Sequence, residues 1–121
     1  MKVLVADDSA TMRMIVRLNL RKAGLDGEDV REAANGHEAL AVLATWQPDV
    51  VLCDWNMPGM DGIDVLRTLR RDGNPVPVGF LTADVTDELR AQAMDAGALF
   101  VLGKPFDGAT LRSHLARVSV D

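Results

Sequence analysis

The segment at residues 50–62, VVLCDWNMPGMDG, decides the fold class because it joins an apolar run to a loop of chain-breaking residues. The run over Asp49–Cys53 is almost uniformly apolar, which is typical of a β-strand that is covered on both faces of a sheet. The next nine residues, Asp54–Gly62, contain glycine, proline and asparagine, so they indicate a loop. Apolar residues then recur at helical spacing over Ile63–Arg71. A strand that is apolar throughout, followed by an amphipathic helix, is the unit of an α/β sheet.

The same alternation of strand and helix runs along the whole chain. The predicted strands are Lys2–Ala6, Asp29–Ala34, Asp49–Cys53, Pro77–Leu81 and Leu99–Leu102. The predicted helices are Ser9–Ala23, His37–Thr45, Ile63–Arg71, Thr86–Ala96 and Asp107–Val118, with Ser9 and Thr86 as capping residues. The second strand is the least distinct, because charged residues interrupt it. Five strands alternating with five helices predict one parallel sheet, covered on both faces and joined by right-handed crossovers.

Length and composition indicate one globular domain. The chain has 121 residues, 48% hydrophobic and 26% charged, and no apolar run reaches the roughly 20 residues of a membrane helix. Thirteen Lys and Arg against eighteen Asp and Glu give a net charge of -5, which disfavours direct binding of nucleic acid. Acidic residues follow the first strand at once, so we expect no signal peptide and a cytoplasmic protein. The lone Cys53 excludes an internal disulfide and a cysteine zinc site.

Polar residues collect at the carboxyl ends of four predicted strands. They are Asp7, Asp8, Asp54, Thr82 and Lys104. Ligands of open α/β sheets bind beyond these strand ends, so the five side chains converge if the first, third and fourth strands are central. Taken singly, an Asp-Asp pair is usually a helix cap or a solvated loop, and a Lys-Pro pair is usually a turn. Their joint placement at four strand ends favours a functional site.

The chemistry of this set points to phosphoryl transfer to an aspartate. Three neighbouring carboxylates need a cation or protons to compensate their charge. Mg²⁺ suits them, because it prefers oxygen ligands and takes one or two carboxylates together with water. A carboxylate beside the metal can attack phosphorus. Lys104 can then neutralise one phosphoryl oxygen, and the Thr82 hydroxyl can donate a hydrogen bond to another.

Four motifs together resemble the receiver domain of bacterial two-component response regulators, and among these the single-domain CheY-like receivers. The motifs are Asp7-Asp8-Ser9, Asp54–Gly62, Thr82-Ala83 and Lys104-Pro105-Phe106. The resemblance extends to about Val118 and implies a flavodoxin-like, CheY-like three-layer sandwich with five helices and a five-stranded parallel sheet of order 2-1-3-4-5. It also implies that residues 1–121 form one receiver domain with no output domain.

The resemblance assigns roles around a Mg²⁺ site. Asp54 matches the phosphoacceptor, which takes a phosphoryl group from the phosphohistidine of a histidine kinase. Asp8 matches a direct metal ligand, and Asp7 matches a ligand that usually acts through water. The backbone carbonyl at Asn56 would complete a metal set of Asp7, Asp8, Asp54 and Asn56. Trp55 directly follows the nucleophile, so we expect it to be partly exposed beside the metal.

The switch region of the family is only partly present. Thr82 and Lys104 match the switch hydroxyl and the phosphate-binding lysine, and the Lys104-Pro105 bond matches one that is commonly cis. Receivers usually carry Tyr or Phe three residues before the lysine, and its ring turns inward when the hydroxyl moves toward the phosphate. Val101 stands there in this chain, which contains no Tyr. Phe100 should point to the opposite face of the sheet, because side chains alternate along a strand.

The resemblance implies a phosphoacceptor signalling protein, with autophosphorylation and slow autodephosphorylation as its only activities. Its expected partners are a sensor histidine kinase and, by similarity to chemotaxis receivers, a flagellar motor switch protein or a phosphatase. The output face of the family corresponds to about Thr86–Val118. A phosphate sink, a phosphorelay intermediate and an adaptor receiver are the alternatives. We expect a monomer that contacts neither nucleic acid nor membrane.

Two other classes of protein share part of the pattern. Phosphatases of the haloacid-dehalogenase type also use a strand-end Asp, Mg²⁺, Thr and Lys, but they need a second Asp where Asn56 stands. A flavodoxin-like flavin carrier shares the architecture, but Asp7 and Asp8 would repel the cofactor phosphate. A P-loop is excluded because Lys104 is followed by proline and lacks the upstream glycine spacing.

The remaining arginines and histidines have simpler explanations. Arg13, Arg17 and Arg21 recur every four residues, which predicts a solvated helix face. His37 and His114 lack the spacing of metal ligands, so we expect both on solvated helix positions.

Overall fold

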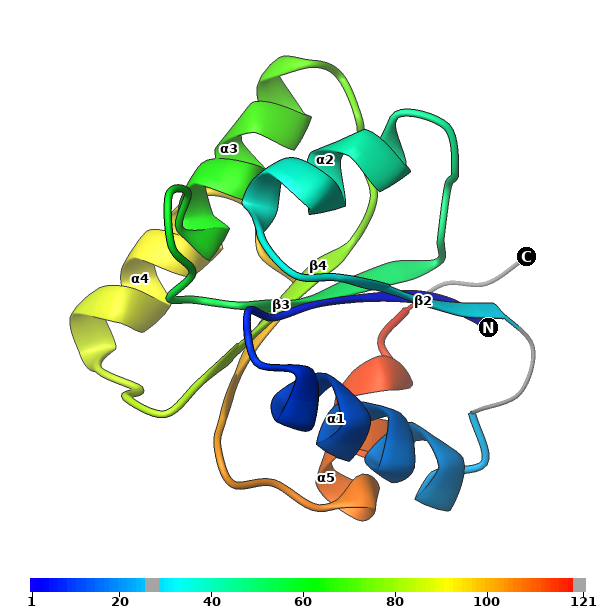
Figure 1. Cartoon of the computed structure of the whole chain (residues 1–121). Coiled ribbons are helices and arrows are strands. Elements are labelled where there is room, and N and C mark those ends of the chain that lie inside the picture. The colour runs from blue at the N-terminus through cyan, green and yellow to red at the C-terminus, as the bar shows by residue number, and fades with distance from the viewer. Residues whose placement is uncertain (26–28, 119–121) are drawn as a thin grey trace.

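A parallel sheet lies between two layers of helices in the computed structural model, which describes residues 1–25 and 29–118 (Figure 1). The strands are β1 (Lys2–Ala6), β2 (Asp29–Ala33), β3 (Val50–Asp54), β4 (Val78–Thr82) and β5 (Phe100–Gly103). The helices are α1 (Ala10–Lys22), α2 (Gly36–Leu43), α3 (Gly62–Arg71), α4 (Asp87–Asp95) and α5 (Gly108–Leu115). The strand order is β2-β1-β3-β4-β5, and every pair is parallel, which confirms the predicted fold.

The helices begin and end where the sequence signals placed their caps. The side-chain oxygen of Ser9 accepts a hydrogen bond from the backbone N–H of Met12, and that of Thr86 accepts one from the N–H of Leu89. Each bond satisfies a backbone donor in the first turn of the helix. Gly24 and Gly97 follow α1 and α4 with φ of 75° and 97°, in the left-handed region that glycine adopts without strain. Predicted and observed helix ends differ by at most three residues.

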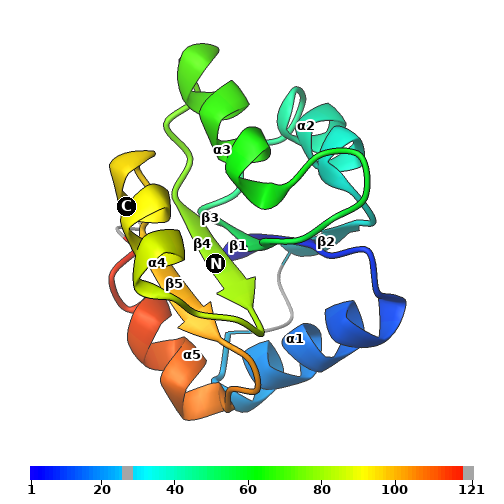
Figure 2. The ribbon, with the colours of Figure 1, turned by 90° about the vertical axis from the view of Figure 1, so that its left-hand side faces the viewer.

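Strand alternation divides the core into two clusters, one on each face of the sheet. Helices α2, α3 and α4 cover one face, and α1 and α5 cover the other (Figures 1 and 2). Phe80 and Val101 belong to the first cluster, and Phe100 belongs to the second. The prediction that Phe100 and Val101 face opposite sides is therefore confirmed.

The ring of Phe100 from β5 packs directly against the backbone of Gly79 in β4, in the space that a side chain would occupy. A Cβ atom at residue 79 would lie 2.2 Å from Cζ of that ring, so a larger residue would displace it. The edge strand β2 pairs only with β1, which explains why its charged residues are tolerated on a half-exposed strand. No helix in the described ranges is long and apolar enough to cross a membrane.

Two predictions about surface residues are wrong. The side chain of Arg13 is only 16% exposed, because its Nε atom pairs with Glu32 Oε1 at 2.8 Å across to β2. His114 is half-buried, since its ring lies against that of Phe100, tilted by 59° with 5.0 Å between ring centroids. His37 is exposed, as expected.

Candidate functional site

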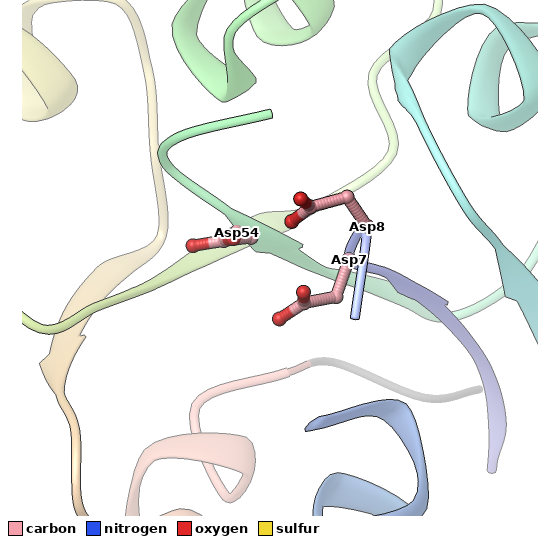
Figure 3. Close-up of side chains that lie close together, drawn as sticks. All are labelled: Asp7, Asp8 and Asp54. Carbon is pink, nitrogen blue, oxygen red and sulfur yellow. The ribbon is translucent and has the colours of Figure 1, made fainter. Parts of the chain in front are cut away.

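Three aspartates meet at the carboxyl edge of the sheet, at the ends of two neighbouring strands. Strands β1 and β3 pair in parallel register as far as Ala6 and Cys53, so the next residue of each, Asp7 and Asp54, is brought to the same edge. Asp8 follows directly. Figure 3 shows the three side chains gathered there, and one carboxylate oxygen of each lies within 4.8 Å of the others.

Lys104 supplies the positive charge at this cluster. Its Nζ atom lies 3.3 Å from Asp7 Oδ2 and 3.3 Å from Asp54 Oδ1. The lysine follows β5, and its backbone N–H donates to the carbonyl of Thr82 at 2.8 Å. The Lys104-Pro105 peptide bond is cis, as predicted. One ammonium group therefore bridges the two buried carboxylates, while Asp8 is exposed to solvent.

Burial changes the ionisation of the groups at the end of β3. Burial is the main reason that the pKa of Asp54 is raised, and the charge of Asp7 adds to this effect. Lys104 and the backbone N–H of Asn56 act in the opposite direction, because they stabilise the carboxylate. Burial also raises the pKa of the Cys53 thiol, with contributions from Asp54 and Asp7. The thiol therefore stays protonated and is a poor nucleophile. The carboxylate of the next residue, Asp54, belongs to the acidic cluster.

The other predicted site residues lie around this centre at different depths. Thr82 is buried at the end of β4, between the strands that carry Asp54 and Lys104, and its hydroxyl accepts the backbone N–H of Asp84 at 3.3 Å. Asn56 is exposed in the loop after β3. Trp55 is half-buried as expected, with its ring edge-on to that of Phe80 at 4.9 Å between centroids.

Gly62 holds the loop after the nucleophile, and sequence reasoning did not single it out. Its N–H donates to the carbonyl of Trp55 at 2.9 Å, which closes the loop onto the start of α3. A Cβ atom at this position would lie 2.4 Å from the carbonyl oxygen of Asp54 and 2.9 Å from the Phe80 ring. Only glycine fits so close to the backbone of the nucleophile. Its place at the end of a breaker-rich loop was the available signal.

The oxygen donors of the cluster fit a hard divalent cation. Three carboxylates beside one lysine, which pairs with Asp7 and Asp54, leave an excess of negative charge at a partly solvated edge. Mg²⁺ binds such sites through one or two carboxylates and keeps water on its other positions. Among the described residues, Asp7, Asp8 and Asp54 form the group whose spacing could hold a metal ion.

A shallow pocket of about 180 Å³ lies over Val101, between α4 and α5. Arg90 and Met94 line it from α4, and His114 and Arg117 line it from the last helix and the turn that follows. Val101 itself carries no aromatic ring, so this pocket lacks the switch ring that the resemblance led us to look for at this position.

Comparison with known protein families gives one match that covers most of the chain. Residues 3–116 match the family model described as the response regulator receiver domain. All six residues proposed for the site, from Asp7 to Lys104, fall within this range.

Individual relatives agree with the family match. The chain is 41% identical to chemotaxis protein CheY-3 of Vibrio cholerae serotype O1 over 98% of its own length and 91% of that protein. It is 37% identical to chemotaxis protein CheY of Pseudomonas aeruginosa, covering 98% and 95% of the two chains. Among solved structures, Vibrio cholerae chemotaxis protein CheY4 superposes with a TM-score of 0.86 at 36% identity, over 98% of both chains. The Francisella response regulator 1452 receiver domain gives 0.81 at 35% identity, over 95% and 93%.

Proposed function

The chain belongs to the response regulator receiver domain family, and from this premise we propose that it accepts a phosphoryl group on Asp54 from a histidine kinase. The observation that carries the proposal is the position of Asp54 itself. Its carboxylate lies between the ammonium group of Lys104 at 3.3 Å and the two further acids of the cluster. Asp7 shares the burial, the lysine partner and the cluster, but its Oδ1 atom already accepts the Ser9 N–H at 2.9 Å, and Asp54 stands at the position that matches the phosphoacceptor of the family.

The phosphoryl transfer is a nucleophilic substitution at phosphorus. A carboxylate oxygen of Asp54 forms the new O–P bond while the N–P bond to the kinase histidine breaks. The imidazole leaves with the bonding electrons and takes up a proton from solvent. Lys104 neutralises charge on the phosphoryl oxygens, and the Thr82 hydroxyl, one strand away, donates a hydrogen bond once the group is in place.

Mg²⁺ would be held by the carboxylates of Asp8 and Asp54 and the backbone carbonyl of Asn56, with Asp7 acting through water. When bound, the ion would offset the negative charge that the acids and the phosphoryl group bring together. These residues would keep the ion beside the nucleophile. The buried Asp7 is fixed in place by the N–H of Ser9, which donates to its Oδ1 atom at 2.9 Å.

The proposed role is that of a cytoplasmic receiver in chemotaxis, which signals by changing its own surface. Support comes from the CheY relatives, which the chain covers almost from end to end. The surface over α4, β5 and α5 would then meet a flagellar motor switch protein in the phosphorylated state. A phosphate sink, a relay intermediate or an adaptor receiver would share the same phosphorylation chemistry but would lack this partner.

The chemistry is tested by incubating the chain with acetyl phosphate or phosphoramidate and Mg²⁺ and measuring its intact mass. The wild-type chain should gain one labile phosphoryl group, and Asp54→Asn should gain none. The gain should disappear when EDTA removes Mg²⁺. A wild-type chain that stays unmodified, or an Asp54→Asn chain that is modified equally, would refute the mechanism.

The biological role needs a separate experiment. The purified chain, with and without phosphoramidate and Mg²⁺, is applied to immobilised motor switch protein from a flagellated bacterium. Binding that appears only with the phosphodonor supports the chemotaxis role. Equal or absent binding in both states favours the phosphate sink or the relay.

A further inference from the structure

Arg13 of α1 contacts the backbone that carries the acidic pair. Its Nη1 atom donates a hydrogen bond to the carbonyl oxygen of Asp7, and its Nε atom donates to Glu32 Oε1 on β2 at 2.8 Å. The side chain of Arg13 is 16% exposed; its bond to the Asp7 carbonyl is partly buried, and its bond to Glu32 lies at the exposed surface. One guanidinium group thereby joins the end of β1 to the neighbouring edge strand.

The Asp7 carbonyl is part of the peptide unit that positions Asp8. The unit is planar, so fixing its oxygen also fixes the direction in which the Asp8 backbone leaves it. The rest of Asp7 is already held, because its N–H donates to Ala33 at 3.0 Å and its Oδ1 atom accepts from Ser9 at 2.9 Å. Asp8 is exposed, and its orientation therefore depends on this backbone.

The charge of Arg13 opposes the geometric effect. A guanidinium close to the cluster repels a divalent cation, which would weaken the binding of Mg²⁺. Glu32 offsets part of this repulsion, because it pairs with Arg13 at 2.8 Å and with Arg17 at 3.2 Å. The two effects predict opposite outcomes when Arg13 is replaced. Geometry predicts weaker binding of Mg²⁺, and charge predicts tighter binding.

We propose that Arg13 is a positioning residue, whose bond to the Asp7 carbonyl orients Asp8 toward the Mg²⁺ that the proposed function requires. This inference rests on the proposed metal site. Residues that orient metal ligands through a hydrogen bond typically change metal affinity by about 10- to 100-fold when replaced. For an Arg13 contact made through the backbone, about tenfold is expected.

The test measures the Mg²⁺ dissociation constant of the unphosphorylated chain by tryptophan fluorescence, since Trp55 follows Asp54 directly. Arg13→Gln should bind Mg²⁺ about tenfold more weakly than wild type. Arg17→Gln is the matched control, because Arg17 lies on the same helix, shares Glu32 and donates to the Val30 carbonyl at 3.2 Å rather than to Asp7. The control should stay within about twofold of wild type, since changes away from metal ligands have small effects.

A second variant at this position separates the effect of the positive charge from that of the hydrogen-bond geometry, and it serves as the test if Arg13→Gln does not fold. Arg13→Lys keeps the positive charge and the apolar stem but loses the planar fork that reaches two acceptors. It should bind Mg²⁺ several-fold more weakly than wild type. Thermal unfolding without Mg²⁺, measured on each variant, identifies losses that come from stability alone.

Each outcome is decisive for one hypothesis. Wild type that binds no Mg²⁺ refutes the proposed function, together with the premise of this inference. Wild type that binds Mg²⁺, with Arg13→Gln and Arg13→Lys binding equally well or more tightly, overturns the inference alone. Equal weakening by Arg17→Gln also overturns it, because the ion pairs to β2 would then matter rather than the Asp7 carbonyl.

Discussion

Replacing Asp54 by Asn should make the chain more stable in the absence of Mg²⁺, although it removes the nucleophile. Burial and the charge of Asp7 raise the pKa of Asp54, so its ionised form is disfavoured in the folded state. Lys104 lies 3.3 Å from both carboxylates and carries only one charge, so it cannot neutralise both. Asparagine removes the second negative charge and leaves the Asp7–Lys104 ion pair in place.

The size of the gain follows from the spacing of the carboxylates. At the 4.8 Å limit, two like charges repel by about 1 kcal/mol if fully hydrated and by about 3.5 kcal/mol at an effective dielectric constant of 20. Losing the attraction of Lys104 for Asp54 cancels part of this relief. A net gain of about 1 kcal/mol is expected, which would raise the Tm of a domain of this size by about 4 °C.

Thermal unfolding followed by circular dichroism at pH 7 with EDTA measures this difference. Because the folded-state pKa of Asp54 is raised above 3.8, the penalty for its charge is absent below the unfolded-state pKa and develops as pH rises through the folded-state value. The difference in Tm between wild type and Asp54→Asn should therefore vanish near pH 3 and increase toward neutral pH. Mg²⁺ at 100 times its dissociation constant stabilises wild type by about 2.7 kcal/mol and should reverse the order.

Equal Tm values at pH 7 without Mg²⁺ would refute the reasoning, and so would a difference that persists below the normal pKa of aspartate. Asp72→Asn provides the control, since Asp72 is exposed at the end of α3. Its effect should stay within about 0.5 kcal/mol.

Lys104→Met should slow phosphorylation by phosphoramidate about 10²-fold, as expected for the loss of one fixed donor to the transferred group. In this variant the fall of the phosphorylation rate at acidic pH should also begin at a higher pH, because Lys104 lowers the pKa of Asp54. Gly79→Ala should cost about 1–3 kcal/mol in urea unfolding, because the new Cβ overlaps the Phe100 ring. Cys53 should react with a chromogenic thiol reagent at pH 8 about 10³-fold more slowly in the folded chain than in urea, because it is fully buried.

Matched variants make these three outcomes interpretable. Lys22→Met, at the exposed end of α1, should leave phosphorylation unchanged. Gly103→Ala places its Cβ 3.2 Å from a single side-chain atom of Val85, so it should destabilise less than Gly79→Ala. Fast reaction of Cys53 in the folded chain would contradict its burial, and an unaltered pH profile in Lys104→Met would contradict the role of Lys104 in holding Asp54 ionised.

Much of the fold was predictable because local patterns report burial directly. Consecutive positions of β3 before Asp54 are apolar, as expected of a strand that is covered on both faces. The Ser9 and Thr86 caps were recognisable from residue type. Even β2 was found, although its charged residues weakened the pattern. Those charges reflect its place at the edge of the sheet, which depends on the strand order and not on the strand's own sequence.

Some contacts between distant segments could not be predicted from the sequence. The spacing of Arg13 within its helix predicts only a helix face, and nothing in that spacing shows that Glu32 lies beside it. The ion pair exists because β2 returns next to β1, which brings together residues 19 apart in the chain. His114 was misjudged for the same reason, since its contact with Phe100 depends on how α5 packs against β5.

The sequence by itself determined the alternation of strands and helices and placed Asp7, Asp8, Asp54, Thr82 and Lys104 at strand ends, because burial and turn chemistry are local properties. Tertiary structure alone decided that these strand ends meet, that one lysine serves two carboxylates, and that Gly62 and Arg13 support the backbone around them. Charge interactions and close contacts act over a few ångströms in space, whatever the separation along the chain. They become definite only when the sheet brings distant segments to one edge.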